Sequence, residues 1–452
     1  MMFGMAVTSG EVTTSLIILV MVFAFVRELG NKGRKEVFPP SPSKKYGDVF
    51  LIKLGMVPVL VVNGMETVKV LLKNGEHFAE SYAFNGENWK LHKKIASNAL
   101  QTFSKAEAKS STCSCLLEEH VIEEVSELVK VFTELTSKSG SFEPRGAITC
   151  AMANVIYTLC FGKRYDHSDE EFLRIVKTDD DLLKASNATN PADFIPSFRY
   201  LPLQTINAPQ EFYHAPNQAF ILCLCPQDHI QDITDALINA CHNKYAVTKT
   251  TTLNEDEILS TVSDLFGAGM YTFSLFSWFE IISTCILWSV LYLVYYPEIQ
   301  VKIQEEIDGI IAMKSPRFED RKILPYTEAF INEIFRHTSF LLFTIPHWKT
   351  CTFINMYQVN HDKPERFLNE NRELNKSLIE KVFIFGMGIQ KCLREEGAQN
   401  EVFVFITTVL QQLTLKKRPM AELDLTPTYG LVMKPKPYQF QAEPRSMGSF
   451  CS

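Results

Sequence analysis

The chain has 452 residues, 46% of them hydrophobic, and a formal net charge of −7. This length allows one large helical domain, and an acidic balance without a basic stripe argues against a nucleic-acid partner. The 33 phenylalanines predict a large aromatic interior, and the 11 cysteines include no C-x-x-C pair of the zinc type. A reducing, cytosolic environment fits these cysteines best.

The N-terminal stretch 12–26 is uncharged and mostly apolar, and basic residues follow it from Arg27 onward. The positive-inside rule then places the N-terminus in the lumen and the rest of the chain in the cytosol. We predict a membrane anchor over residues 1–27. As a helix, the apolar run rises only ~22 Å, short of a ~30 Å hydrocarbon core, so a buried N-terminal helix is the alternative.

Residues 28–45 form a basic, proline-rich hinge, because successive prolines stiffen the backbone there. The segment from Tyr46 to Val62 alternates like a β-hairpin and opens a domain predicted over residues 46–452. From residue 116 to residue 182 the apolar pattern is helical, with a turn predicted near Gly162.

Two short charged motifs precede the last part of the chain. Glu333 and Arg336 are three residues apart, so they can pair on one face of a helix. Arg366 follows in the segment Pro364-Glu365-Arg366-Phe367. A buried network of these charges would cost desolvation and would serve the architecture more than the stability.

The stretch 383–392 is rich in glycine and apolar residues and ends in a single cysteine, Cys392. Its glycines allow the positive φ that a β-bulge or a ligand-hugging loop needs. Backbone N–H groups in such a loop, and the dipole of the apolar helix predicted after it, would stabilise a thiolate. A thiolate held this way suits the axial ligand of a haem iron.

Three motifs, Phe385-x-x-Gly388-x-x-x-Cys392, Glu333-x-x-Arg336 and the segment 364–367, resemble in order and spacing the signatures of the cytochrome P450 monooxygenases. The finer resemblance is to family 1, the aromatic-hydrocarbon and steroid hydroxylases. The stretches that carry it are 324–330, 343–347, 358–362, 385–388 and 425–431. The resemblance covers almost the whole chain. It implies a mainly α fold with a small β-region and an N-terminal membrane anchor helix.

The resemblance also implies a cofactor, haem b, with Cys392 as the ligand of its iron. Phe385 and Gly388 would line the haem, while Trp89 and Lys93 would contact its propionates. Lys93 occupies the position of an arginine in the family. Its ammonium cannot bind a carboxylate through two parallel hydrogen bonds, as a guanidinium does.

Arg394 stands where the family has a glycine after the cysteine. That glycine lets the next helix pack against haem. A bulky arginine should therefore either strain the pocket or swing out toward a propionate.

The stretch 262–269 resembles the start of the helix that crosses the distal haem face, where Gly267 and Ala268 would leave room for dioxygen. The acid and threonine that follow in the family, and that relay protons, are not both present. One register supplies Thr272 as the alcohol, and a register nine residues later supplies Glu280 as the acid. Nine extra residues turn a helix by about 900°, so this insertion cannot be absorbed with both ends keeping their faces, and we predict a kink or an extruded turn between Met270 and Phe279. An ordinary helix hydroxyl is the alternative for Thr272.

The resemblance implies a flat, apolar aromatic or steroid substrate. The residues expected around it are Asp264, Gly267, Ala268, Phe340 and Leu431. O2 would be the oxidant, and electrons from NADPH would arrive through NADPH-cytochrome P450 reductase. Microsomal relatives imply the endoplasmic reticulum membrane, with its lipid as a partner and the catalytic domain facing the cytosol.

Departures from the family pattern leave two other hypotheses open. The loop from residue 78 to residue 89 and the hairpin expected after residue 347 are shorter than in the family. A non-catalytic or degraded haem protein of the same fold is the first alternative. An oxygen-independent haem isomerase is the second, since relatives that lack the acid–alcohol pair can rearrange peroxides.

Overall fold

The computed structural model describes residues 49–54, 57–62, 117–174, 176–177, 278–338, 351–354, 363–382, 384–386, 391–392, 394–428 and 432–445, together with the single residues 47, 67, 69, 94 and 97. Backbone contacts divide the chain into two compact units, Met1–Val49 and Phe50–Ser452. Almost all of the described residues belong to the second unit, to which the following description applies.

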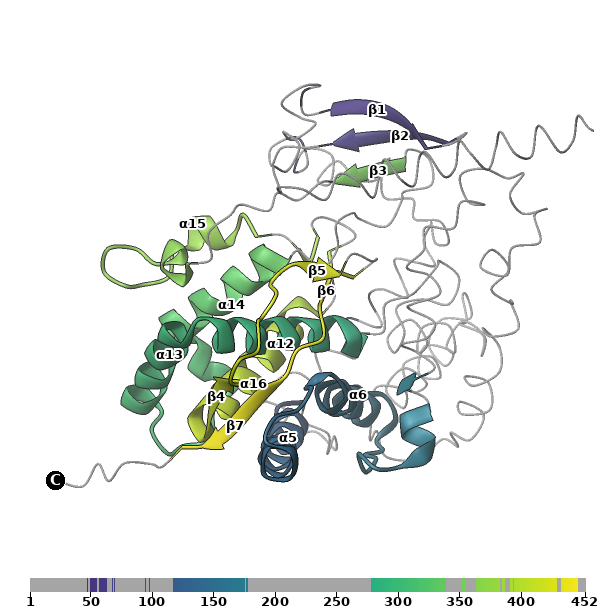
Figure 1. The fold of residues 1–452 in the computed structure, drawn as a ribbon. Coiled ribbons are helices and arrows are strands. Elements are labelled where there is room, and N and C mark those ends of the chain that lie inside the picture. The colour runs from purple at the N-terminus through teal and green to yellow at the C-terminus, as the bar shows by residue number, and fades with distance from the viewer. Residues whose placement is uncertain are drawn as a thin grey trace, which may run out of the picture. The chain divides into compact units, whose positions relative to one another are not determined.

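The α-helices are α5 (Leu117–Ser139), α6 (Arg145–Phe161), α12 (Trp278–Tyr295), α13 (Pro297–Ile310), α14 (Pro325–Thr338), α15 (Lys376–Ile379) and α16 (Glu395–Gln412). Two 3-10 helices are η3 (Phe318–Lys322) and η4 (Pro364–Phe367). The strands are β1 (Val49–Leu54), β2 (Val57–Val62), β3 (Cys351–Ile354), β4 (Leu413–Lys417), β5 (Pro427–Thr428), β6 (Lys434–Pro435) and β7 (Phe440–Pro444). Within these ranges, the predicted mainly α fold with a small β-region is confirmed (Figure 1).

Helix α5 is positioned by the spacing of its apolar residues. Val121, Val125 and Leu128 recur every three to four residues, and all three are fully buried. On the exposed side of the helix, Lys130 donates a hydrogen bond to Glu127 at 2.9 Å. The helix packs against α6, α16 and β7.

The helical pattern predicted from residue 116 to residue 182 contains α5 and α6, and residues 170–174 and 176–177 are helical as well. Gly140, with a φ of 72°, follows α5, and Pro144 precedes α6. Gly162, with a φ of 62°, ends α6 and donates its N–H to the Thr158 carbonyl at 2.9 Å. The turn near Gly162 is confirmed. The sequence pattern missed the break at 140–144, because the apolar period resumes directly after it.

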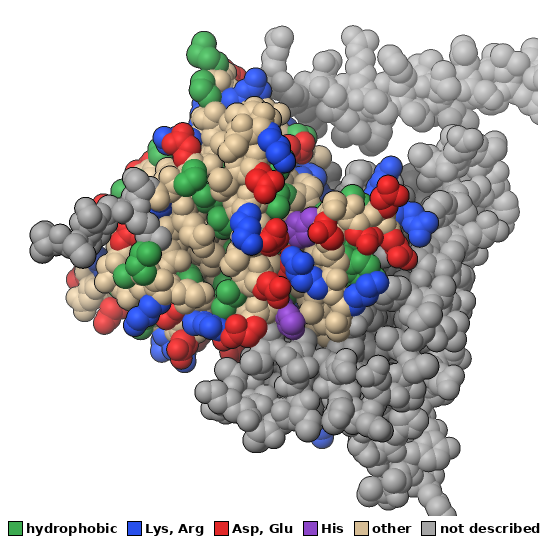
Figure 2. Space-filling view, turned by 90° about the horizontal axis from the view of Figure 1, so that it is seen from below, with side chains coloured by type: hydrophobic (Ala, Val, Ile, Leu, Met, Phe, Trp, Pro, Cys, Tyr) green, Lys and Arg blue, Asp and Glu red, His purple; other side chains and the backbone are tan. Residues whose placement is uncertain are grey.

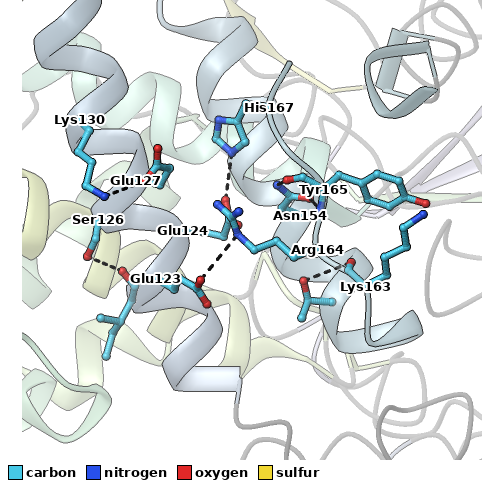
Figure 3. Close-up of polar contacts among 12 residues, drawn as sticks. Glu123, Glu124, Ser126, Glu127, Lys130, Asn154, Lys163, Arg164, Tyr165 and His167 are labelled. Carbon is cyan, nitrogen blue, oxygen red and sulfur yellow. Dashed lines mark hydrogen bonds and ion pairs between the residues drawn. The ribbon is translucent and has the colours of Figure 1, made fainter. Parts of the chain in front are cut away.

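Two buried polar side chains hold the loop after α6 (Figure 3). Asn154 on α6 donates to the Tyr165 carbonyl at 2.8 Å and accepts the Tyr165 N–H at 3.1 Å. From α5, the buried Glu124 forms an ion pair with Arg164 and a contact of 3.0 Å with His167. The loop is therefore tied to both helices, because Asn154 fixes its backbone and Glu124 fixes its charged side chains.

Helix α12 lies within the hydrophobic core. Nearly every side chain over 280–294 is buried, and the helix contacts α6, α14, α16, β4 and β6. The Trp288 indole N–H donates to the Met433 carbonyl at 3.0 Å, and the Tyr438 hydroxyl donates to the Leu287 carbonyl at 2.7 Å. Buried Trp and Tyr need such partners, so these bonds fix the C-terminal strands on α12.

Pro297 begins α13 directly after α12, and the two helices are bent by 105° at this break. Proline cannot continue a helix but suits its first position. The buried amide of Gln300 donates to the Leu415 carbonyl at 2.9 Å and accepts the Leu415 N–H at 2.7 Å. Gln304 donates to the Leu413 carbonyl at 3.1 Å, so α13 is fastened to β4, which pairs antiparallel with β7.

The β-hairpin predicted over 46–62 is confirmed in outline, since β1 and β2 are neighbours in one sheet. Strand β2 also pairs in parallel with β3, with Val59 opposite Cys351 and Val62 opposite Ile354. Strands β5 and β6 form a separate antiparallel pair.

No single helix in the ranges given above is long and apolar enough to cross a membrane, and α12 and α13 meet that criterion only together, as a bent pair. The predicted anchor over 1–27 and hinge over 28–45 lie outside the described residues, as do residues 270–277 of the segment in which the kink is predicted.

Aromatic rings fill part of the core, as the phenylalanine content predicts. The ring centroid of Phe440 lies 4.7 Å from that of Phe142 and 5.5 Å from that of Phe132. On the face that Figure 2 shows, acidic and basic side chains are interspersed. Exposed ion pairs contribute about 0–1 kcal/mol each, so the stability of this unit depends mainly on its apolar core.

Candidate functional site

The loop that carries Cys392 is closed by its own backbone. Gly386 adopts a φ of 75°, and the Cys392 N–H donates to the Phe385 carbonyl at 2.8 Å. The N–H of Arg394 donates to the Cys392 sulfur, with the nitrogen 3.4 Å from Sγ. Helix α16 begins at Glu395, so the positive end of its dipole lies at the residues that follow the sulfur.

Among the three cysteines whose side chains the structure describes, Cys392 has the surroundings of a thiolate. Cys150 and Cys285 are buried in α6 and α12. Burial raises the pKa of the Cys150 thiol to about 11 and raises the pKa of the Cys285 thiol as well. Cys392 is only half-buried and accepts a backbone N–H at the start of a helix.

The charged motif on α14 forms a buried network. Arg336 binds Glu333 through two hydrogen bonds, from Nε at 2.7 Å and from Nη2 at 2.9 Å. Arg366 of η4 reaches the same carboxylate, with Nε 3.6 Å from Oε1, and the Lys363 N–H donates to Oε1 at 3.1 Å. The structure thus brings Glu333, Arg336 and Arg366 together.

Phe385 connects the cysteine loop to the same helix. Its ring centroid lies 5.4 Å from that of Phe335 on α14, with an angle of 81° between the rings. This edge-to-face contact is a favourable aromatic geometry. Because Phe335 lies between Glu333 and Arg336 in the sequence, the network and the loop are supported by one helix.

The structure corrects the expectation for Arg394. Its side chain does not swing outward, which was one of the two expected outcomes. Instead Arg394 as a whole residue is 2% exposed, and its guanidinium donates to the carboxylate of Glu401, a residue that is 1% exposed. Burial raises the pKa of the Glu401 carboxyl, and the guanidinium acts in the opposite direction. The rotamer directed at a propionate is therefore not the one observed.

Glu280, the predicted acid of the proton relay, lies in the first turn of α12 and is 3% exposed. Its carboxylate forms an ion pair with Lys434 of β6. The side chain of Lys434 is itself 12% exposed, so the pair is buried.

Nine predicted site residues lie outside the described residues: Trp89, Lys93, Asp264, Gly267, Ala268, Thr272, Phe340, Gly388 and Leu431. Their roles stay predictions. Three others, Phe385, Cys392 and Arg394, meet at the junction of the loop and α16.

In the described part of the chain, two charged side chains that the sequence did not point to form ion pairs with predicted site residues. Glu401 follows Arg394 by seven positions, which is two helical turns, and this spacing could have indicated a pair on one face of α16. Lys434 belongs to a strand far from Glu280 in the sequence, so no local spacing points to it.

The junction at Cys392 fits the proximal side of a haem. A half-buried sulfur that accepts a backbone N–H beside a helix N-terminus has surroundings that favour a thiolate, which is the ligand that haem iron takes from a cysteine. Together with the helical fold, this junction has the features that the class of haem-thiolate proteins requires of its cysteine loop.

Comparison with known proteins gives the family. The sequence model of the family described as Cytochrome P450 matches residues 18–354 and 361–442. Cytochrome P450 1A5 of Gallus gallus is 41% identical over 449 residues, which cover 87% of this chain and 83% of the relative. Cytochrome P450 1A3 of Oncorhynchus mykiss is 40% identical over 458 residues, covering 90% and 86%. Cytochrome P450 1A1 of Felis catus is 38% identical over 446 residues, covering 87% and 84%. The chain therefore belongs to family 1 of the cytochromes P450.

Membership of the family establishes the activity in general terms. The chain is a cytochrome P450 monooxygenase with haem b, and it uses O2 and electrons from NADPH that arrive through a reductase. When bound, haem supplies the site at which oxygen is activated. The protein supplies the sulfur ligand, its orientation and a shielded pocket.

Proposed function

We propose that this chain hydroxylates flat, apolar aromatic or steroid-like substrates, with Cys392 as the ligand of the haem iron. The observation that carries the proposal is the N–H of Arg394 directed at the Cys392 sulfur from 3.4 Å, at the start of α16. A sulfur held in this way would keep its negative charge and would donate electron density to a haem iron, which is the chemistry that a cysteine ligand supplies.

We further propose where the protein works. Residues 1–27 would anchor it in the endoplasmic reticulum membrane, in contact with lipid, and residues 46–452 would face the cytosol. The apolar run over 12–26 and the basic residues after it support this orientation. In the cytosol the domain would receive electrons from NADPH-cytochrome P450 reductase.

The remaining contacts are assigned from the family resemblance. Trp89 and Lys93 would bind the haem propionates, and Phe385 and Gly388 would line the haem. The substrate would lie among Asp264, Gly267, Ala268, Phe340 and Leu431. Glu333, Arg336 and Arg366 support the proximal side, since their network fixes the helix on which Phe385 packs.

Proton delivery is proposed to involve the Thr272 hydroxyl and the Glu280 carboxylate. A carboxylate that is paired with an ammonium takes up a proton less readily, so Glu280 would serve better once it has left Lys434. This contact favours a second candidate function, a non-catalytic haem protein of the same fold. An oxygen-independent isomerase is a third, because peroxide rearrangement needs no proton relay.

Two measurements separate these candidates. The carbon monoxide difference spectrum of the reduced, membrane-bound protein should show a thiolate-type Soret band; a neutral-thiol band or none supports the non-catalytic candidate. Hydroxylated product should then form from a polycyclic aromatic probe only when both reductase and NADPH are present. Rearrangement of an added peroxide without NADPH, and no hydroxylation with it, would instead identify an isomerase.

A further inference from the structure

Residue 394 connects the cysteine loop to α16, and both its backbone N–H and its backbone carbonyl form hydrogen bonds. Its N–H donates to the Cys392 sulfur at 3.4 Å, and its carbonyl accepts the Ala398 N–H at 2.9 Å. The second bond is the first of α16, so residue 394 connects the sulfur mechanically to that helix.

The side chain of Arg394 is fixed as firmly as its backbone. It runs along the first two turns of α16 and ends on Glu401, and both side chains are 1% exposed. Gly397 makes this route possible. A Cβ at position 397 would lie 3.0 Å from Cγ and 3.1 Å from Nε of Arg394, which is tighter than most real Cβ contacts, so Arg394 would have to move by a few tenths of an ångström.

We propose that Arg394 and Glu401 form a clamp that positions the Cys392 sulfur, so that Arg394 is a positioning residue for the haem ligand. This inference rests on the proposal that Cys392 ligates the iron. Rotation of the peptide of residue 394 away from the sulfur would also move the guanidinium away from the Glu401 carboxylate. Two buried charges would then be unpaired, which is strongly unfavourable. The ion pair therefore holds the N–H of residue 394 on the sulfur and fixes the position of that sulfur relative to α16.

The clamp also explains how the chain accommodates a long side chain at this joint. Three residues on one face of α16 are matched to one another: a guanidinium at 394, no side chain at 397 and a carboxylate at 401. Changing one of them alone should disturb the sulfur, and changing both charged residues together should restore it.

The test compares Glu401→Gln, Arg394→Gly and the double variant as purified full-length holoproteins. The readout is the fraction of bound haem that gives the thiolate-type rather than the neutral-thiol Soret band in the reduced, carbon monoxide-bound state. Glu401→Gln leaves the guanidinium buried without its counter-charge, so we expect at least half of the thiolate-type signal to be lost. The double variant keeps the N–H of residue 394 but buries no charge there, so it should regain most of that signal.

Gly397→Ala tests the same clamp without removing a charge. The added methyl displaces Arg394, so we expect a partial shift toward the neutral-thiol band. The matched control is Gly309→Ala on α13, where a Cβ meets nothing within 4 Å, and its spectrum should equal that of the unaltered protein. Glu124→Gln controls for the loss of a buried carboxylate elsewhere, since Glu124 pairs with Arg164 and His167.

The proposal is overturned if Glu401→Gln keeps the full thiolate-type signal, or if the double variant is no better than Glu401→Gln. Should Glu401→Gln fail to fold, the comparison passes to Gly397→Ala and the double variant. An unshifted Gly397→Ala, or a double variant that folds with a neutral-thiol band, then contradicts the clamp. Absence of a thiolate-type band in the unaltered protein would instead refute the ligand assignment itself.

Discussion

Glutamate side chains account for most of the buried negative charge in the part of the chain that the structure describes. Each of the five that are buried contacts a basic side chain; they are Glu124, Glu280, Glu328, Glu333 and Glu401. Such pairs add little net stability, but removing one partner leaves a buried charge uncompensated. They therefore specify which segments meet: loop with helix at Glu124, strand with helix at Glu280, and η4 with α14 at Glu333.

Glu333→Gln should lower the free energy of unfolding by about 3 kcal/mol, because Arg336 and Arg366 would lose their shared carboxylate. The midpoint of urea unfolding measures this loss. Glu134→Gln, which removes an exposed pair with Lys138, is the control and should change the stability by less than about 0.5 kcal/mol. Equal midpoints for the two variants would show that the α14 network does not support the fold.

At the scale of elements, the described core is assembled by helices that carry specific polar connectors. Gln300 and Gln304 fasten α13 to β4, and Asn154 fastens α6 to the loop behind it. Each connector satisfies backbone groups that would otherwise be buried without a partner. The apolar faces of the helices drive their packing. The polar side chains of Gln300, Gln304 and Asn154 determine which backbone segments these helices contact.

Asn154→Ala should destabilise the loop after α6 by about 2 kcal/mol, because the buried backbone N–H and carbonyl of Tyr165 would lose their partner. Amide hydrogen exchange at Tyr165 should become faster. Ser137→Ala, which removes a hydroxyl on the exposed side of α5, should leave that exchange rate unchanged. Unaltered protection in Asn154→Ala would mean that Glu124 alone holds the loop.

The β5–β6 hairpin should weaken in acid. Hydrogen bonds from Lys436 and Thr426 lower the pKa of Asp424 from 3.8 to about 2. A carboxyl with a lowered folded-state pKa stabilises the fold above its unfolded pKa, and this contribution is lost as the pH falls from about 4 to about 2. Because Asp424 is half-exposed, we expect less than about 0.5 kcal/mol. Asp424→Asn should remove this step from an acid titration of stability, and a step that persists would assign it to another carboxyl.

At the scale of the whole molecule, motif order and apolar spacing were enough to predict the helical class, the hairpin of β1 and β2 and the family. These features are local, or they depend on short motifs in a fixed order. The joining of Glu333, Arg336 and Arg366 also followed from spacing and resemblance.

The sequence did not predict an ion pair whose partner comes from a distant segment. It also did not predict the partner of a residue that replaces a different residue in the family. Lys434 meets Glu280 through the packing of β6 on α12, which no local pattern encodes. The expectation for Arg394 came only from comparing its size with that of the glycine in the family. In the structure its side chain runs along α16, past Gly397, and pairs with Glu401. Both cases depend on tertiary packing, which decides where a long charged side chain ends.

The most direct test removes the sulfur of Cys392 and measures the Soret band of the bound haem. Cys392→Ala and the control Cys150→Ala, which alters a buried thiol on α6, are reconstituted with haem, reduced and exposed to carbon monoxide. We predict that the thiolate-type Soret band disappears in Cys392→Ala and persists in Cys150→Ala. A thiolate-type band that survives in Cys392→Ala would contradict the assignment of Cys392 as the iron ligand.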